Sequence, residues 1–239
     1  MHLTRPLAAL IPALNAAPSI GDVVRGTREV IDVVIVVDDG SKDQTAARAR
    51  ESGAEVIVHP KNLGKGAALR SGFAHIWDLG FEGVVTLDAD GQHLPEEIPK
   101  MFDSWESGAD LVLGTRDHLF DEMARIRRTS NRVSSRLISF AAGLTLPDIQ
   151  TGFRIYSRDL VESTGFPENR FEAESAVVVR AAQGNFKIST VPINLGFSDG
   201  RCTSHYRPVV DSLRIARAVI SARLRSPETR RRSARASRR

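Results

Sequence analysis

The stretch "VIVVDDGSKDQT", Val34 to Thr45, begins as a hydrophobic strand and ends in a polar turn. Its four consecutive apolar residues indicate a strand that is buried on both faces, as in parallel sheets. Asp38 and Asp39 follow at once, and Gly40 comes next. Asp, Gly and Ser are ordinary turn and helix-capping residues. Ligands of parallel α/β sheets also bind at the carboxyl ends of strands, so a binding role is an equal alternative.

Strand and helix patterns alternate along the rest of the chain. Apolar runs predict buried strands at residues 7–11, 33–37, 55–58, 83–87 and 110–114. Helical spacing lies between them, at residues 19–30, 43–52, 65–79 and 95–107. Later strands are expected at 152–157 and 186–193, with helices near 172–183 and 208–224. This order predicts an α/β, Rossmann-like fold with a mostly parallel central sheet and helices on both faces.

The composition is typical of a soluble globular protein with one large domain. The chain has 239 residues, of which 41% are hydrophobic and 26% are charged. Its single cysteine, Cys202, excludes an intrachain disulfide and suits a reducing, cytoplasmic compartment. No apolar run approaches the roughly 20 residues that a membrane-spanning helix needs.

The positive charge is concentrated in the last residues. Residues 226–239 contain six arginines and one glutamate, a net charge of +5, whereas the whole chain carries +4. We therefore expect residues 1–225 to form one domain and residues 226–239 to form a basic, disordered tail. Because residues 1–225 carry a net charge of only −1, the sequence does not favour specific nucleic-acid binding by the fold.

A second acidic cluster follows the fourth predicted strand, in "TLDADGQH". Asp88 and Asp90 are two residues apart, which places both side chains on one side of an extended backbone. Two neighbouring carboxylates repel each other unless a proton or a cation lies between them. Magnesium is commonly held by one or two carboxylates together with substrate phosphates and water. The two acidic strand ends therefore predict a site for a metal and a diphosphate.

Other phosphate-binding and nucleophile motifs are not recognisable in the sequence. There is no G-x-x-x-x-G-K-[ST], and no G-x-G-x-x-G follows the first strand. In "NLGKGAA", Gly64 and Gly66 favour a tight turn into the next helix. Lys65 between them has two equal interpretations, a phosphate contact or a solvated side chain. No Ser–His–Asp arrangement can be read from the sequence.

Seven motifs occur in an order that resembles the family 2 glycosyltransferases of the GT-A fold. They are "IPALN", "VVDDGSKDQT", "NLGKGAALRSGF", "TLDADGQHLPEEI", "GTRD", "IQTGFRIYSRDL" and "VPI". The resemblance covers about residues 6–220 and is closest to dolichyl- or polyprenyl-phosphate sugar synthases and their bacterial relatives. It implies a metal-dependent hexosyltransferase that uses a UDP- or GDP-linked sugar as its donor.

The resemblance also implies roles for individual residues. Those expected to bind the nucleotide and donor are Pro12, Leu14, Asn15, Asp38, Asp39, Lys65, Asp88, Asp90, Arg116, Arg201 and His205. Asp90 and Gln92 would hold Mg²⁺ or Mn²⁺, and Asp39 or Asp38 would contact the base. We expect the strand-end carboxylate of Asp39 to be accessible to solvent. Relatives commonly have a glutamate after the asparagine of the first motif, where this chain has Ala16, which leaves the base preference open.

The family chemistry is glycosyl transfer with inversion, in which Asp88 assists binding of the sugar and nucleotide. An alcohol acceptor needs a general base, and the candidates are Glu172 and Glu174, with a slight preference for Glu172. Acidic residues also suit the start of a helix without any catalytic role.

A lipid phosphate is the expected acceptor. In the resembling enzymes, arginine and serine bind the acceptor phosphate near the positions of Arg127, Arg128 and Ser130. The last predicted helix is amphipathic, and its expected apolar side consists of Val209, Leu213, Ala216, Ile220 and Leu224. Such a helix covers a sheet or lies in a bilayer interface. The arginine tail would add about 1 kcal/mol per residue at an anionic membrane, which favours peripheral association at the inner face of the cell membrane.

Three alternatives from other functional classes remain. The first is transfer to a soluble sugar or another hydroxyl acceptor. The second is a catalytically inactive protein that binds a nucleotide sugar with the same fold. The third is a sugar-nucleotide pyrophosphorylase, which is disfavoured because "IPALNAAPSI" after the first strand lacks a glycine-rich, basic loop.

Overall fold

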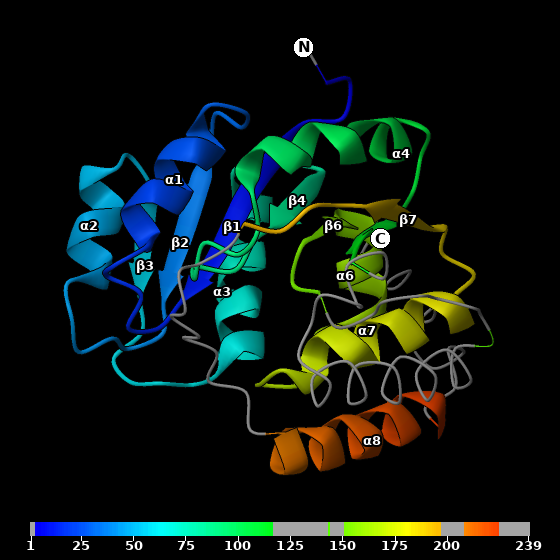
Figure 1. Cartoon of the computed structure of the whole chain (residues 1–239). Coiled ribbons are helices and arrows are strands. Elements are labelled where there is room, and N and C mark those ends of the chain that lie inside the picture. The colour runs from blue at the N-terminus through cyan, green and yellow to red at the C-terminus, as the bar shows by residue number, and fades with distance from the viewer. Residues whose placement is uncertain (1–2, 117–142, 144–150, 197–207, 225–239) are drawn as a thin grey trace.

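The computed structural model describes residues 3–116, 143, 151–196 and 208–224 (Figure 1). A seven-stranded sheet runs through this part of the chain in the order β3-β2-β1-β4-β6-β5-β7. The strands are β1 (Leu7–Ala13), β2 (Val34–Asp38), β3 (Glu55–Val58), β4 (Gly83–Thr86), β5 (Leu111–Thr115), β6 (Arg154–Ser157) and β7 (Ile188–Pro192). Only β6 is antiparallel to its neighbours, β4 and β5. The predicted, mostly parallel α/β sheet is therefore confirmed.

The helices follow the predicted pattern with two differences. They are α1 (Ile20–Arg28), α2 (Thr45–Glu51), α3 (Lys65–Asp78), α4 (Phe102–Glu106), α6 (Arg158–Thr164), α7 (Glu172–Gln183) and α8 (Pro208–Leu224). The single helix expected at 95–107 is a 3₁₀ helix, η1 (Pro95–Met101), followed by α4. Pro99 lies inside η1, where it lacks the amide hydrogen that a regular α-helix needs. Helix α6 was not expected, and Ser157 caps it by accepting a hydrogen bond from the Leu160 amide.

The two faces of the sheet carry separate apolar clusters. Along β1, Ala8 and Leu10 belong to one cluster and Leu7, Ala9 and Ile11 to the other. The first cluster contains residues of α3, α7 and α8, and the second contains residues of α1, η1 and α4. Because successive strand residues point to opposite faces, a strand buried on both sides must be apolar at nearly every position. This requirement explains the continuous hydrophobic runs in the sequence.

Helix α8 packs in the protein interior through a stripe that differs from the predicted one. Ile215, Val219 and Ala222 are buried in the same cluster as residues of α7. Ile220, which was expected on the apolar side, is 59% exposed. The buried face of α8 therefore packs against the domain, and Ile220 lies on its exposed side. None of the helices in the described segments is long and apolar enough to cross a bilayer.

Candidate active site

A cavity of about 450 Å³ lies at the carboxyl ends of the parallel strands. Its lining comes from the end of β1, from the loops after β1, β2, β3 and β4, from the start of α3, from the segment before α7, and from α8. The lining residues are Pro12, Ala13, Leu14, Asn15, Ala16, Asp39, Asn62, Gly64, Lys65, Ala68, Asp88, Ala89, Asp90, Arg170, Phe171 and Arg214. Seven residues expected to bind the donor are thus brought together around one cavity. Asn62, Arg170, Phe171 and Arg214 were not expected there.

The two aspartates of the opening motif have different environments. Asp38 is buried, and its Oδ1 accepts a hydrogen bond from the Ser41 amide at 2.8 Å, so it stabilises the turn. Asp39 lines the cavity. Its Oδ1 accepts the Leu63 amide at 2.9 Å and its Oδ2 accepts the Gly64 amide at 2.7 Å. Asp39 is only 4% exposed, so the expectation that its carboxylate is accessible to solvent was wrong.

Asp39 also lies at one end of a Ser–His–Asp arrangement that was not recognisable in the sequence. His59 Nδ1 is 2.7 Å from Asp39 Oδ1, and His59 Nε2 is 2.9 Å from Ser71 Oγ. Ser71 lies on α3, in the second turn of the helix, and is not part of the cavity lining. The arrangement therefore holds the Asp39 carboxylate in position from the side away from the cavity. It does not present a nucleophile to the cavity.

Asn15 connects the first loop of the cavity to the second. Its φ is 51°, in the left-handed region that asparagine tolerates better than most residues. Its Oδ1 accepts the Lys42 amide, and its own amide donates to Ser41 Oγ, both at 2.8 Å. The amide of Ala16 donates to Thr45 Oγ1 at 2.8 Å. These bonds hold the ends of β1 and β2 as one wall of the cavity.

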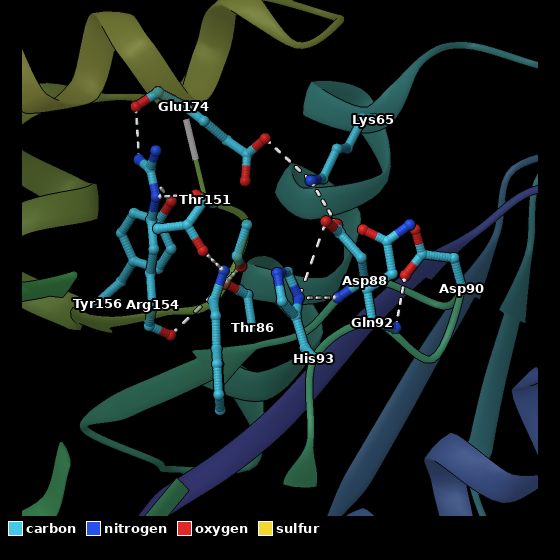
Figure 2. A network of polar contacts seen from close by, with 12 residues as sticks. Lys65, Thr86, Asp88, Asp90, Gln92, His93, Thr151, Arg154, Tyr156 and Glu174 are labelled. Carbon is cyan, nitrogen blue, oxygen red and sulfur yellow. Dashed lines mark hydrogen bonds and ion pairs between the residues drawn. The ribbon is translucent and has the colours of Figure 1, made fainter. Parts of the chain in front are cut away.

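The Lys65 ammonium group forms ion pairs with two acidic residues, so it is neither a solvated side chain nor an unpaired charge. Its Nζ lies 2.6 Å from Asp88 Oδ1 and 2.9 Å from Glu174 Oε2 (Figure 2). Burial alone would lower the pKa of Lys65, but the charges of Asp88 and Glu174 raise it above its ordinary value. Burial alone would raise the pKa of Asp88, but the charge of Lys65, followed by that of His93, holds it well below its usual range.

Asp90 and Gln92 form the part of the site that suits a divalent cation. The Gln92 amide donates to Asp90 Oδ1 at 3.0 Å, so the turn orients this carboxylate. Burial, together with the neighbouring charge of Asp88, raises the pKa of Asp90. Within the described residues, no three His, Cys, Asp or Glu side chains are grouped to hold a metal. One carboxylate with an amide oxygen fits Mg²⁺ or Mn²⁺ that receives its other ligands from phosphates and water.

His93 and Gly152 fix the position of Asp88, and neither was anticipated from the sequence. His93 Nδ1 accepts the Asp88 amide at 3.0 Å, and its ring stacks on Phe153 with centroids 5.3 Å apart. A Cβ atom on Gly152 would lie 2.7 Å from Asp88 Oδ1 and 2.8 Å from Lys65 Nζ. Because such contacts are too short, only glycine allows the loop before β6 to approach the ion pair this closely.

The fully buried Arg154 connects this loop to α7 (Figure 2). Its Nε donates to the Thr151 carbonyl at 2.8 Å, and its Nη1 donates to the Glu174 carbonyl at 2.5 Å. Tyr156 Oη lies 3.3 Å from the same Nη1. Burial raises the pKa of Tyr156 to about 12, so it remains a neutral phenol at physiological pH. Arg154 thus holds the backbone at the start of α7, where the Glu174 side chain reaches Lys65.

The two candidate bases differ in their contacts. Glu174 is buried and paired with Lys65, and among the described residues its Oε1 has no hydrogen-bond partner. Glu172 also has one buried, unpaired oxygen, Oε2. The contacts therefore join Glu174 to the charged network of the cavity, whereas the preference from sequence was for Glu172. A catalytic role for either residue stays a prediction.

The remaining predicted site residues lie at the edge of the described segments or outside them. Arg116 is the last described residue of its segment, and its charge contributes to the low pKa of Asp88, which agrees with a position near the cavity. The predicted donor residues Arg201 and His205 lie outside the described residues. The predicted acceptor residues Arg127, Arg128 and Ser130 also lie outside them, as does the basic tail at 226–239.

The chain resembles glycosyltransferases in sequence and in structure. Residues 8–165 match the model of glycosyl transferase family 2. Glycosyltransferase AglJ of Haloferax volcanii is 32% identical over 186 residues, which are 77% of this chain and 60% of AglJ. The dolichyl-phosphate hexose transferase of the same organism is 33% identical over 190 residues, or 78% of this chain and 81% of that enzyme. This chain thus spans about three fifths of one relative and four fifths of the other.

Among solved structures, the chain is similar to glucosyl-3-phosphoglycerate synthase of Mycobacterium tuberculosis in complex with Mn²⁺, UDP and phosphoglyceric acid. The TM-score is 0.71 with 23% identity, and the match covers 94% of this chain and 80% of that one. At this identity the similarity establishes the fold. The chain belongs to glycosyl transferase family 2, and the predicted glycosyltransferase with a GT-A fold is confirmed.

We expect Asp39→Asn to lower the free energy of unfolding by about 1–3 kcal/mol, because an amide NH₂ would face the Gly64 or Leu63 amide and leave a buried donor unpaired. Asp22→Asn is the control, since Asp22 pairs with Arg25 on the exposed surface of α1 and should change stability by less than about 0.5 kcal/mol. Urea unfolding measures both. Equal stability of the two variants would contradict a buried, hydrogen-bonded Asp39.

We expect Lys65→Met to cost more stability at pH 7 than at pH 3. The lowered pKa of folded Asp88 means that its ionised form stabilises the protein above the unfolded value of about 3.9, and that this contribution is lost as the pH falls through the folded pKa. Without Lys65, the ionised Asp88 has lost its charged partner at pH 7, whereas at pH 3 part of the Asp88 contribution is already absent in the wild type because this pH lies below the unfolded pKa. Denaturant unfolding of both proteins across this range is the measurement, and a loss that is independent of pH would contradict the ion pair.

Proposed function

We propose that this protein transfers a hexose, with inversion, from a UDP- or GDP-linked sugar to a polyprenyl phosphate, and that the reaction depends on Mg²⁺ or Mn²⁺. The observation that carries the proposal is the cavity shared by Asp39, which follows β2, and by Asp88 and Asp90, which follow the parallel strand β4. The cavity of about 450 Å³ has the size of a small-molecule site. The similarity to a dolichyl-phosphate hexose transferase supports the choice of acceptor.

The donor would extend along the cavity from the β1–β2 wall to the end of β4. The wall formed by Pro12, Leu14 and Asn15 would pack against the nucleoside. Asp39 is an acceptor held by two backbone amides, and so it would bind a base that presents an N–H group. Asp88 would contact the sugar and ribose side of the donor, close to Lys65.

Asp90 and Gln92 would hold the divalent cation at the diphosphate. When bound, such a cation neutralises the charge that develops on the leaving diphosphate. The turn that joins the Gln92 amide to Asp90 keeps the carboxylate oriented before the donor arrives. Arg116 would add positive charge beside Asp88.

In the transfer, an oxygen of the acceptor attacks the anomeric carbon from the face opposite the diphosphate. A carbon–oxygen bond forms there, the bond to the diphosphate breaks, and the nucleoside diphosphate leaves with the electron pair. A phosphate acceptor is already ionised near neutral pH and needs no general base. A hydroxyl acceptor would need one, and Glu174 is then the better placed carboxylate because it belongs to the charged network.

Peripheral membrane association would bring the protein to a lipid acceptor. The exposed face of α8 presents Arg217 and Ile220, and the six arginines of residues 226–239 follow this helix in the sequence. Cationic residues beside an apolar one suit the surface of an anionic bilayer.

We expect transfer of labelled hexose from UDP-glucose or GDP-mannose to a polyprenyl phosphate in detergent to require Mn²⁺ or Mg²⁺. Asp90→Ala should lower both transfer and the metal-dependent affinity for the nucleoside diphosphate by about tenfold or more, as expected when metal coordination is disturbed. Asp103→Ala, an exposed aspartate of α4, is the control and should change neither. Transfer that survives chelation would refute the metal, and transfer to glucose or glycerol alone would refute the lipid acceptor.

We expect the full chain to float with anionic liposomes at low salt and to be released at high salt, because screening weakens surface charge interactions. Neutral liposomes should bind less at both salt concentrations. A chain that ends at Leu224 should lose most of this association. If the full chain ignores anionic liposomes at low salt, peripheral association is excluded, and if truncation has no effect, the tail is not its cause.

A further inference from the structure

The Asp39 carboxylate, which would bind the base of the donor, already accepts three hydrogen bonds from the protein. His59 Nδ1 lies 2.7 Å from Asp39 Oδ1, and the Leu63 amide donates to the same oxygen at 2.9 Å. The Gly64 amide donates to Oδ2 at 2.7 Å. Because an ionised carboxylate can only accept hydrogen bonds, Nδ1 of His59 carries the proton in this contact.

These three donors limit what Asp39 can still offer to a ligand. Each carboxylate oxygen has two lone pairs, so a carboxylate has about four acceptor positions in total. His59 and the Leu63 amide occupy both positions on Oδ1, and the Gly64 amide occupies one of the two on Oδ2. Among the described residues, Asp39 therefore retains one acceptor position, and it belongs to Oδ2.

The oxygen with the remaining position is the one on the cavity side. Gly64, which binds Oδ2, lines the cavity together with Asp39. His59 and Leu63, which bind Oδ1, are not part of this lining. Oδ2 is thus directed toward a ligand in the cavity, and Oδ1 is directed toward the protein.

The surroundings of Asp39 give this acceptor position a fixed direction. Gly40 has a φ of 78°, and a Cβ atom there would lie 2.6 Å from the carbonyl carbon of Lys61. Only glycine therefore allows the loop after β3 to lie this close to the turn that follows β2. His59 is buried, and its Nε2 lies 2.9 Å from Ser71 Oγ on α3, which holds the imidazole ring in place.

We infer that the base of the donor is uracil, whose single N–H at N3 matches the single acceptor position of Asp39, and that His59 is the positioning residue for this contact. The inference rests on the proposed function, in which Asp39 contacts the base. Guanine presents two neighbouring donors, N1–H and the N2 amine, which match both oxygens of a carboxylate. At Asp39 the second oxygen is already bound by His59 and the Leu63 amide. The N2 amine would then lose its hydrogen bond to water without a replacement, which weakens binding.

The first test compares bases on the wild-type full chain. Titration calorimetry with Mn²⁺ measures the affinities for UDP, CDP, GDP and IDP. Cytosine has no N–H at N3, and hypoxanthine in IDP keeps the N1–H of guanine but lacks the N2 amine, so IDP is the matched control for GDP. UDP should bind at least about tenfold more tightly than CDP and GDP, the usual effect of one hydrogen bond at a buried group. IDP should bind more tightly than GDP.

The second test changes His59. His59→Leu removes the donor to Asp39 Oδ1, whereas His59→Asn keeps an amide NH₂ close to the position of Nδ1. His59→Leu should lower the ratio of UDP to CDP affinity by about tenfold, and His59→Asn should keep most of this ratio. The affinity for pyrophosphate with Mn²⁺ should change less than about twofold in both variants. His75→Leu is the matched control, because His75 pairs with Glu55 on another part of α3 and does not line the cavity.

The outcomes separate this inference from the proposed donor site. Equal affinities for UDP and CDP would refute the N–H contact with Asp39, and GDP that binds as tightly as UDP would refute the choice of uracil. IDP that binds as weakly as GDP would refute the explanation by acceptor positions. If pyrophosphate affinity falls in parallel in His59→Leu, or if His75→Leu lowers the ratio equally, His59 is not a positioning residue for the base. Failure of the wild type to bind any nucleotide or pyrophosphate would instead refute the proposed donor site itself.

Discussion

The ion pair of Lys65 with Asp88 and Glu174 is the contact on which the cavity depends. It connects the start of α3, the end of β4 and the first turn of α7, which are far apart in the sequence. Taking these charges out of water is costly, and loss of one partner from a buried pair typically costs about 3–5 kcal/mol. The Lys65 side chain is 14% exposed, so its two carboxylates are held firmly in place. An acidic site can therefore persist at a strand end before any cation binds there.

Gly152, Arg154 and His93, which surround the ion pair, make this arrangement possible. Gly152 leaves room for the ion pair, and Arg154 ties the adjacent loop to the backbone of α7. His93 holds the backbone of Asp88. Asp39 is supported in a similar way by His59 and two amides. Asp88 and Asp39 are thus both held in position by neighbouring protein groups. These side chains therefore need to move less when a charged ligand binds.

The charged groups of the cavity differ in whether they already have a partner of opposite charge. Asp88 and Lys65 neutralise each other, while Asp90 has a raised pKa because it is buried beside Asp88. A cation at Asp90 would relieve that repulsion. Arg170 and Arg214 line the same cavity from the segment before α7 and from α8, away from the acidic strand ends. The single cavity is thus lined both by strand-end carboxylates and by side chains of α3, α8 and the segment before α7.

The sequence by itself determined the sheet, the helices and the acidic strand ends. Continuous apolar runs such as Val34–Val37 can be satisfied only by strands buried on both faces, and "DDGS" and "DADGQH" must then lie at one edge of the sheet. Only the tertiary structure decided that Asp38 stabilises a turn while Asp39 lines the cavity, and that Lys65 is neutralised by Glu174 more than 100 residues later. It also decided which face of α8 is buried and brought Arg170 and Arg214 to the cavity. These outcomes depend on how distant segments pack, and local periodicity or spacing carries no information about such contacts.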